Sequence, residues 1–171
     1  MKVNINDFIR DVKDFPKEGI IFKDITPLLG NPDALKQATQ DILAIVPKDI
    51  DKVVGIEARG FFFATLLAEH LNAGFVPIRK PGKLPYKTYE ESYALEYGTD
   101  TLTMHIDAIK PGEKVLIHDD VLATGGTAEA VVKLVEKAGG KVVMLNFLII
   151  LDFLAGKDKL KGYEISSLLN Y

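Results

Sequence analysis

Short apolar runs alternate with helix-patterned segments over most of the chain. Four runs are nearly continuous and predict buried strands, at residues 52–56, 75–78, 115–118 and 142–151. Three longer segments have apolar residues at helical spacing and predict helices, at residues 33–46, 61–72 and 128–138. Such strands alternating with helices are typical of a parallel sheet that is covered on both faces. The pattern therefore predicts an α/β fold whose ligand site lies beyond the carboxyl ends of the strands.

Two segments fall outside this alternation. Apolar residues recur at helical spacing over residues 5–12 and predict a short helix that ends at Phe15-Pro16. Residues 80–98 contain prolines, glycines and tyrosines without a clear period, which predicts an irregular lid or binding loop. No internal repeat or long polar linker divides the chain, so we expect a single domain over residues 1–171.

Composition and charge narrow the kind of ligand. The chain is 47% hydrophobic and 26% charged, as in an ordinary globular protein, and its net charge is −3. Nucleic acid is therefore not an expected partner, and any anion must be bound by a local group of cations. The absence of cysteine excludes disulfides and thiolate metal sites. No apolar run reaches the ~18 residues of a membrane span, so no membrane association is expected and the cytoplasm is the predicted location.

The most informative stretch joins the third predicted strand to the helix that follows it. Asp119 and Asp120 end the strand, and a turn of small residues enters the helix: Ala123, Thr124, Gly125, Gly126 and Thr127. The glycines let the backbone approach a ligand, and the unpaired N–H groups of the first helical turn favour a phosphate. Carboxylates beside a phosphate site suit sugar hydroxyls. The block predicts binding of a phosphorylated ribose, whereas mere capping of a helix explains its residues singly but not together.

Two other turns place cations at the same edge of the predicted sheet. Residues 57–60, which include Arg59, follow the first strand, and residues 79–83, which include Lys80 and Lys83, follow the second. Basic groups gathered at one site of a negatively charged chain favour a polyanionic ligand. A solvated turn and a solvated basic loop are the alternatives.

Other familiar sites are not indicated. Residues 55–60 have the glycine spacing of a Walker A loop, but two phenylalanines stand where lysine and Ser/Thr are required, and no dinucleotide-binding glycine pattern follows the first strand. His70, His105 and His118 lack metal-ligand spacing. Structural roles are favoured for all three, and His118, beside the acidic pair, is the one placed to tune the site.

Residues 119–127 resemble the phosphoribosyl pyrophosphate motif of the type I phosphoribosyltransferases. The resemblance runs from about Asp7 to Tyr171 and includes residues 15–16, 19–27, 57–61, 79–85 and 95–98. The stretches at 15–27 and 79–85 narrow it to the members that use adenine. It implies the type I fold, with a parallel-strand core sheet flanked by helices, a small N-terminal base-binding hood at about residues 1–30 and a flexible catalytic loop at about residues 80–98.

The resemblance implies roles in binding the sugar phosphate and the purine. Asp119 and Asp120 would bind the ribose hydroxyls, and the turn would bind the 5-phosphate through Ala123, Thr124, Gly125, Gly126 and Thr127. Glu57 and Ala58 match the same site, in a turn that commonly contains a non-proline cis peptide. The base-binding residues would be Ile21, Phe22, Lys23 and Val121, with Phe22 stacked on the purine. Lys23 stands where arginine is frequent.

The resemblance also implies the chemistry. Arg59 and Lys83, with Lys80 nearby, would hold the pyrophosphate together with Mg²⁺, and no protein side chain is assigned to the metal, which the pyrophosphate and ribose would mainly hold. Glu96 would accept or relay a proton of the purine, with Tyr97 beside it on the loop. The implied reaction converts adenine and phosphoribosyl pyrophosphate to AMP and pyrophosphate, in purine salvage, by a homodimer.

Two alternatives to this reaction remain open from the residues. One is transfer to another purine: hypoxanthine, guanine or xanthine. The other is a nucleotide-sensing regulator on the same fold, although the chain has neither a DNA-binding extension nor a basic surface.

Overall fold

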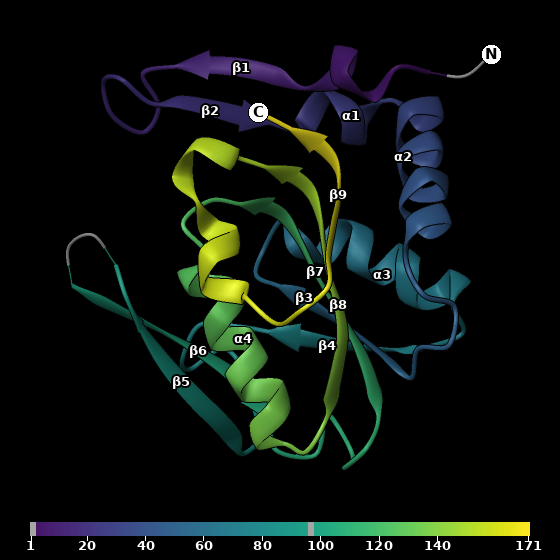
Figure 1. The fold of residues 1–171 in the computed structure, drawn as a ribbon, viewed down its shortest axis with the longest axis vertical. Coiled ribbons are helices and arrows are strands. Elements are labelled where there is room, and N and C mark those ends of the chain that lie inside the picture. The colour runs from purple at the N-terminus through teal and green to yellow at the C-terminus, as the bar shows by residue number, and fades with distance from the viewer. Residues whose placement is uncertain (1–2, 96–97) are drawn as a thin grey trace. The chain divides into compact units, whose positions relative to one another are not determined.

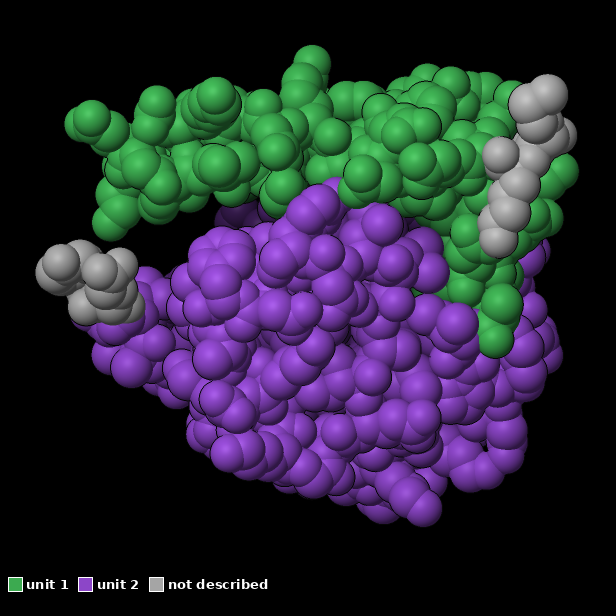
Figure 2. Space-filling view, turned by 45° about the horizontal axis from the view of Figure 1, so that its top comes forward, with its two compact units in different colours: residues 1–44 green, residues 45–171 purple. Residues whose placement is uncertain are grey.

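The structure is a computed structural model that describes residues 3–95 and 98–171 (Figure 1). Its contacts divide the chain into two compact units, Met1–Ala44 and Ile45–Tyr171, coloured green and purple in Figure 2. The hood predicted at about residues 1–30 falls within unit 1, which continues to Ala44. A single domain over the whole chain stays a prediction.

Unit 1 consists of short elements: the 3-10 helix η1 (Ile5–Phe8), strands β1 (Arg10–Lys13) and β2 (Ile21–Asp24), helix α1 (Thr26–Gly30) and helix α2 (Pro32–Ile45), which ends at the boundary. β1 and β2 form an antiparallel two-stranded sheet. The predicted start of α2 is confirmed, because the Asn31 side chain accepts the N–H groups of Asp33 and Ala34 at 3.1 and 3.0 Å. Proline in the first turn suits the same end of the helix.

The helix predicted over residues 5–12 is wrong. Only η1 forms there, with the Asn4 side chain accepting the Asn6 N–H at 3.3 Å, and the chain then pairs with β2. Across that pair, the Arg10 guanidinium donates to the Asp24 carboxylate at 2.6 and 2.9 Å. A helix of two turns is costly to nucleate, so strand pairing and the ion pair decide the conformation.

Unit 2 is built on a parallel sheet of five strands in the order β4-β3-β7-β8-β9. Its elements are β3 (Lys52–Ile56), α3 (Gly60–His70), β4 (Gly74–Ile78), β5 (Thr88–Ala94), β6 (Thr99–His105), β7 (Lys114–Leu122), α4 (Gly126–Lys137), β8 (Lys141–Ile150), the 3-10 helices η2 (Asp152–Leu154) and η3 (Gly156–Leu160), and β9 (Ile165–Asn170). Every strand and helix predicted within this unit is present. The predicted α/β class, with helices flanking a parallel sheet, is confirmed.

The strand order reverses between β3 and β7. The chain leaves β3 through α3 to reach β4 on one side, and leaves β7 through α4 to reach β8 on the other. Since such crossovers are right-handed, α3 and α4 cover opposite faces of the sheet (Figure 1). Ligands of open parallel sheets bind where the order reverses, so the loops after β3 and β7 are the place to look for a site.

The core of unit 2 forms where the sheet meets α4. The apolar residues of this helix face the sheet, since Val131, Leu134 and Val135 are fully buried in one cluster with strand residues that include Ile117 and Phe147. Burial of this apolar area is the main term that stabilises the unit.

No helix in the described part of the chain is long and apolar enough to cross a bilayer.

The sequence predicts an irregular loop over residues 80–98, but part of this stretch is a regular strand. Residues 88–94 form β5, which pairs with β6 in an antiparallel hairpin. Half-buried Tyr89 and Tyr93 alternate with exposed Glu90 and Ser92, a period of two that an apolar-run criterion misses. A bridge between Arg79 and Thr103 joins the hairpin to the end of β4.

Candidate active site

Two adjoining hollows of unit 2 lie at the carboxyl ends of β3 and β7. The larger, about 270 Å³, is lined by Ile56, Glu57, Ala58, Arg59, Lys80, Tyr93, Leu102, Asp119, Asp120 and Thr127. The smaller, about 80 Å³, is lined by Asp119, Val121, Leu122, Ala123, Thr124, Gly125, Thr127, Ala128 and Phe147. Asp119 and Thr127 line both, so the hollows meet at these two residues. The structure thus brings together the acidic pair, the glycine turn and two of the predicted cations at the place where the strand order reverses.

The smaller hollow faces the beginning of α4. Gly125, the N-cap residue, has φ +83°, which glycine adopts without steric cost, and no side chain caps the helix there. The N–H groups of the first turn therefore have no partner within the helix and carry the positive end of its dipole. With the hydroxyls of Thr124 and Thr127 they make a site for a phosphate.

Gly156, at the start of η3, holds this turn in place by direct backbone packing. A Cβ built on Gly125 would lie 2.4 Å from the Gly156 carbonyl oxygen, and a Cβ on Gly156 would lie 2.2 Å from the Ala123 carbonyl oxygen. Only glycine fits at either position. Sequence reasoning did not assign Gly156 to the site, because its contact with the turn joins segments on either side of α4 and β8.

The acidic pair lies at the junction of the hollows. The Asp120 carboxylate, 7% exposed, lies 2.7 Å from Arg59 Nε, and the Asp119 carboxylate accepts the Asp120 backbone N–H at 2.9 Å. A Cβ on Gly60 would lie 2.7 Å from Asp119 Oδ1. The glycine at the start of α3 therefore permits the close approach of this helix to the acidic pair.

The pair is costly in the absence of a ligand. Burial raises the pKa of Asp119 well above its usual range, and the neighbouring charge of Asp120 raises it further. Burial also raises the pKa of Asp120, against the opposing effect of the Arg59 guanidinium. Sugar hydroxyls donate hydrogen bonds to carboxylates, so a bound ribose would supply what the protein lacks at this point.

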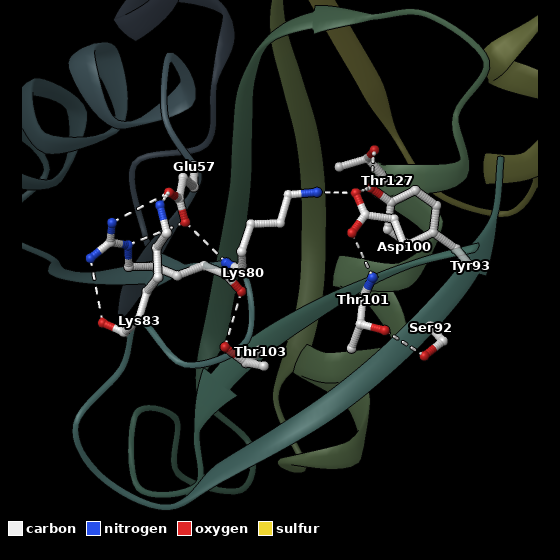
Figure 3. A network of polar contacts seen from close by, with 10 residues as sticks. Glu57, Lys80, Lys83, Ser92, Tyr93, Asp100, Thr101, Thr103 and Thr127 are labelled. Carbon is white, nitrogen blue, oxygen red and sulfur yellow. Dashed lines mark hydrogen bonds and ion pairs between the residues drawn. The ribbon is translucent and has the colours of Figure 1, made fainter. Parts of the chain in front are cut away.

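Each of the three predicted cations is paired with a carboxylate. Arg59 lies against Asp120. Figure 3 shows the other two pairs: Lys83 Nζ lies 3.0 Å from Glu57 Oε1, and the Lys80 ammonium contacts Asp100. Arg59 and Lys80 line the larger hollow, and Lys83 is held beside it by Glu57, which is also in the lining. The site can therefore bind a polyanion if that polyanion displaces or shares the carboxylates.

Glu57 is the most firmly held of these carboxylates. Although burial raises the pKa of Glu57, the Lys80 backbone N–H and the side chains of Lys83 and Arg79 outweigh this and hold the pKa at about 2. The peptide bond between Glu57 and Ala58 is cis, which confirms the prediction for this turn.

His118 is fully buried on β7, beside the acidic pair. Its Nδ1 lies 2.9 Å from the Asn146 side-chain oxygen, and its ring meets that of Phe63 edge-on. Burial lowers the pKa of His118 to about 4, so the ring is uncharged at neutral pH. These contacts agree with the structural role that the sequence favours.

The residues predicted to bind the purine are divided between the two units. Ile21, Phe22 and Lys23 lie on β2 in unit 1, where the Lys23 ammonium is 2.7 Å from Asp11 and the Phe22 ring meets Phe15 edge-on at 5.1 Å. Val121 lines the smaller hollow of unit 2. Glu96 and Tyr97 lie outside the described residues. The roles predicted for all six stay predictions.

Comparison with known proteins agrees with this geometry. Residues 28–167 match the phosphoribosyl transferase domain. The chain belongs to the phosphoribosyltransferase family. Its sequence is 60% identical, over 99% of each chain, to an adenine phosphoribosyltransferase of Christiangramia forsetii.

Solved structures resemble this phosphoribosyltransferase over nearly its whole length. The adenine phosphoribosyltransferase of Rhodothermus marinus is 57% identical with a TM-score of 0.92, covering 98% of this chain and 96% of that one. The enzyme of Saccharomyces cerevisiae is 38% identical with a TM-score of 0.87, covering 94% of each chain, and was solved with an imino-altritol bisphosphate and adenine. The fold and the family are therefore those that the sequence predicts.

Replacing Asp119 with asparagine should stabilise the empty phosphoribosyltransferase. The raised pKa makes the folded state bind a proton more tightly than the unfolded state does, so stability is lost as the pH rises above the usual range of the carboxyl. Asp119→Asn should raise the midpoint of thermal unfolding at pH 7.5 by several degrees, since about 1 kcal/mol moves it by roughly 2–4 °C. The gain should disappear below about pH 3, under the ordinary aspartate pKa of 3.8, where the carboxyl is protonated in both states. Asp107→Asn, which removes an exposed carboxylate, is the matched control; an equal gain in both variants would contradict this account.

Replacing Gly156 with alanine should displace the phosphate-binding turn. A shift of ~1 Å in a positioned site costs on the order of 10²-fold, so the dissociation constant for ribose 5-phosphate, measured by calorimetry, should rise at least about tenfold. Ala155→Gly is the control, because Ala155 has φ +52° and glycine accepts that conformation freely. Unchanged affinity in a folded Gly156→Ala protein would refute the role of Gly156.

Proposed function

We propose that this protein transfers the 5-phosphoribosyl group from phosphoribosyl pyrophosphate to adenine, giving AMP and pyrophosphate. The observation that carries the proposal is the pair of hollows that meet at Asp119 and Thr127. One is built for a phosphate at the beginning of a helix, the other is lined by cations, and carboxylates lie between them. Phosphoribosyl pyrophosphate has a phosphate at one end, a pyrophosphate at the other and a hydroxylated ring in the middle.

The donor binds along this line. The turn that ends in Thr127 takes the 5-phosphate through backbone N–H groups and hydroxyls. Asp119 and Asp120 accept hydrogen bonds from the ribose hydroxyls and hold the ring across the junction. Arg59, Lys80 and Lys83 bind the pyrophosphate, and their fixed charges are worth more in a partly buried site than in water.

Transfer breaks the bond between C1 of the ribose and the pyrophosphate oxygen, and forms a bond from C1 to a purine nitrogen. Positive charge develops on the sugar as negative charge develops on the leaving group. Arg59 and Lys83 stabilise the leaving group, and the carboxylates of the acidic pair lie on the side of the sugar. Glu96 takes the proton that the purine nitrogen loses.

Mg²⁺ is the metal that we infer for this reaction. No group of three or more carboxylates or histidines in the described ranges is arranged to hold a metal ion. Mg²⁺ commonly binds through one or two carboxylates together with substrate phosphates, and Asp119 and Asp120, which line the larger hollow, would offer oxygens of that kind. When bound with the pyrophosphate, it would neutralise charge on the leaving group.

Adenine as the acceptor is supported by the relatives. The Saccharomyces cerevisiae enzyme binds adenine in its crystal structure, and the Christiangramia forsetii protein is an adenine phosphoribosyltransferase. On this chain we assign the purine to Ile21, Phe22 and Lys23. Lys23 offers a point charge where an arginine would offer two parallel donors, and it already contacts Asp11.

We also infer that the protein is a homodimer in the cytoplasm. Sedimentation measures the mass of the particle in solution and tests the dimer.

A purine panel tests the acceptor. With phosphoribosyl pyrophosphate and Mg²⁺, pyrophosphate release should be fastest with adenine and at least about tenfold slower with hypoxanthine, guanine or xanthine, because a polar edge left unpaired costs about 1–3 kcal/mol. If a 6-oxopurine is turned over faster than adenine, that purine is the substrate and the assignment of adenine is wrong. Tight binding to a nucleic acid with no turnover of any base would instead indicate a regulator.

Glu96→Gln tests the proton transfer. A general base typically contributes ~10²–10⁴-fold, so kcat should fall by at least about a hundredfold while the affinity for phosphoribosyl pyrophosphate changes little. Glu90→Gln is the matched control, because Glu90 is an exposed glutamate on β5. If kcat is the same in Glu96→Gln and in the control, Glu96 has no acid–base role.

A further inference from the structure

A chain of polar contacts on the β5–β6 hairpin connects two residues that bind opposite ends of the donor in the proposed function. The Lys80 ammonium forms an ion pair with the Asp100 carboxylate, and the Tyr93 hydroxyl donates to the same carboxylate at 3.3 Å. The Thr127 hydroxyl donates in turn to the Tyr93 oxygen at 3.2 Å. Figure 3 shows this line from Lys80 through Asp100 and Tyr93 to Thr127. The Asp100 carboxylate is thus linked to Lys80, which we assign to the pyrophosphate, and through Tyr93 to Thr127, which we assign to the 5-phosphate.

This chain borders the larger hollow. Lys80, Tyr93 and Thr127 all line it, and Asp100 lies on β6 directly opposite Tyr93 on β5. Of the three carboxylates that pair with the cations, Glu57 and Asp120 belong to the site by sequence resemblance. Asp100 is the third, and neither the sequence pattern nor the reaction accounts for it.

The Asp100 carboxylate has hydrogen-bond partners other than Lys80. Its Oδ1 accepts the Thr101 backbone N–H at 2.8 Å, and the Thr101 hydroxyl is bonded to Ser92 Oγ at 2.8 Å across the hairpin. The lysine partner is different, because an ammonium on a flexible four-carbon stem can turn from one anion to another. The carboxylate is a fixed anion and the lysine is the movable group.

We propose that Asp100 is an internal substitute for the pyrophosphate, which holds Lys80 at the edge of the site and releases it when the donor binds. This rests on the proposed function. A pyrophosphate carries several negative charges against one on Asp100, so it takes the ammonium. The 5-phosphate likewise takes the Thr127 hydroxyl from Tyr93. Asp100 therefore weakens the binding of both the donor and the product pyrophosphate, and sets the affinity at which the site exchanges them.

Asp100→Asn removes the charge and keeps the shape. The amide oxygen still accepts the Thr101 N–H, while Lys80 loses its internal anion. Since a partly exposed ion pair is worth up to about 1 kcal/mol, KM for phosphoribosyl pyrophosphate and the inhibition constant of pyrophosphate should both fall about two- to fivefold, with KM for adenine unchanged. Asp100→Ser, which also lacks the charge and retains an oxygen acceptor, should agree.

Two controls separate this role from a general change in charge. Asp107→Asn removes an exposed carboxylate just after β6 and should leave all three constants unchanged. In a Lys80→Ala background, Asp100→Asn should have no further effect on the donor, because the two side chains act through each other. An equal effect in that background would show simple charge repulsion and overturn the inference.

The outcomes distinguish this inference from the proposed function. If the unaltered protein transfers phosphoribose to adenine but KM for the donor is unchanged or higher in both Asp100 variants, the inference is wrong and the function stands. If the unaltered protein transfers phosphoribose to no purine, the function fails and the inference fails with it.

Discussion

The constraint on which the rest of the site depends is a pair of adjacent carboxylates near the end of β7, of which Asp119 is half-buried and Asp120 is buried. Burial raises the pKa of both carboxyls, and the neighbouring charge of Asp120 raises that of Asp119 further. The arrangement persists because Arg59 lies 2.7 Å from Asp120 and because Gly60 lets α3 approach Asp119 closely. In the proposed function, this local cost has a use, because carboxylates shielded from water accept hydrogen bonds from a sugar without competition from water.

The cations around the acidic pair are also held by partners within the protein. Arg59, Lys80 and Lys83 each pair with a carboxylate, so the positive groups that we assign to the pyrophosphate are balanced within the protein itself. This explains how a chain of net charge −3 keeps a site for a polyanion without a basic surface. In the proposed function, the site works by exchange of partners: sugar hydroxyls donate to the acidic pair, and phosphate oxygens replace internal carboxylates at the cations. The affinity for the donor then depends on a small difference in free energy between the cations paired with internal carboxylates and the same cations paired with phosphate oxygens.

The sequence predicted the parts of this structure that are local and missed those that are assembled by pairing. β3 and the turn before α4 could be predicted because an apolar run or a turn of small residues is determined by a few neighbouring residues. β5 was missed because its alternation is mostly polar, and the helix over residues 5–12 was wrong because pairing with β2 outweighs a weak period. The contacts of Gly156 with Ala123 and of Asp100 with Lys80 join segments distant in sequence, and no local pattern encodes them. Family resemblance supplied the role of Glu96, which lies outside the described residues.

The central claim is that the carboxylates which destabilise the empty protein are those that bind the sugar of the donor. Isothermal titration of phosphoribosyl pyrophosphate with Mg²⁺, in the absence of any purine, tests it most directly when the unaltered protein and Asp119→Asn are compared. Saturable binding to the unaltered protein and at least about tenfold weaker binding to the variant are predicted, since losing a hydrogen bond to a charged group costs about 1.5–3 kcal/mol. Equal affinity of the two proteins would contradict the account.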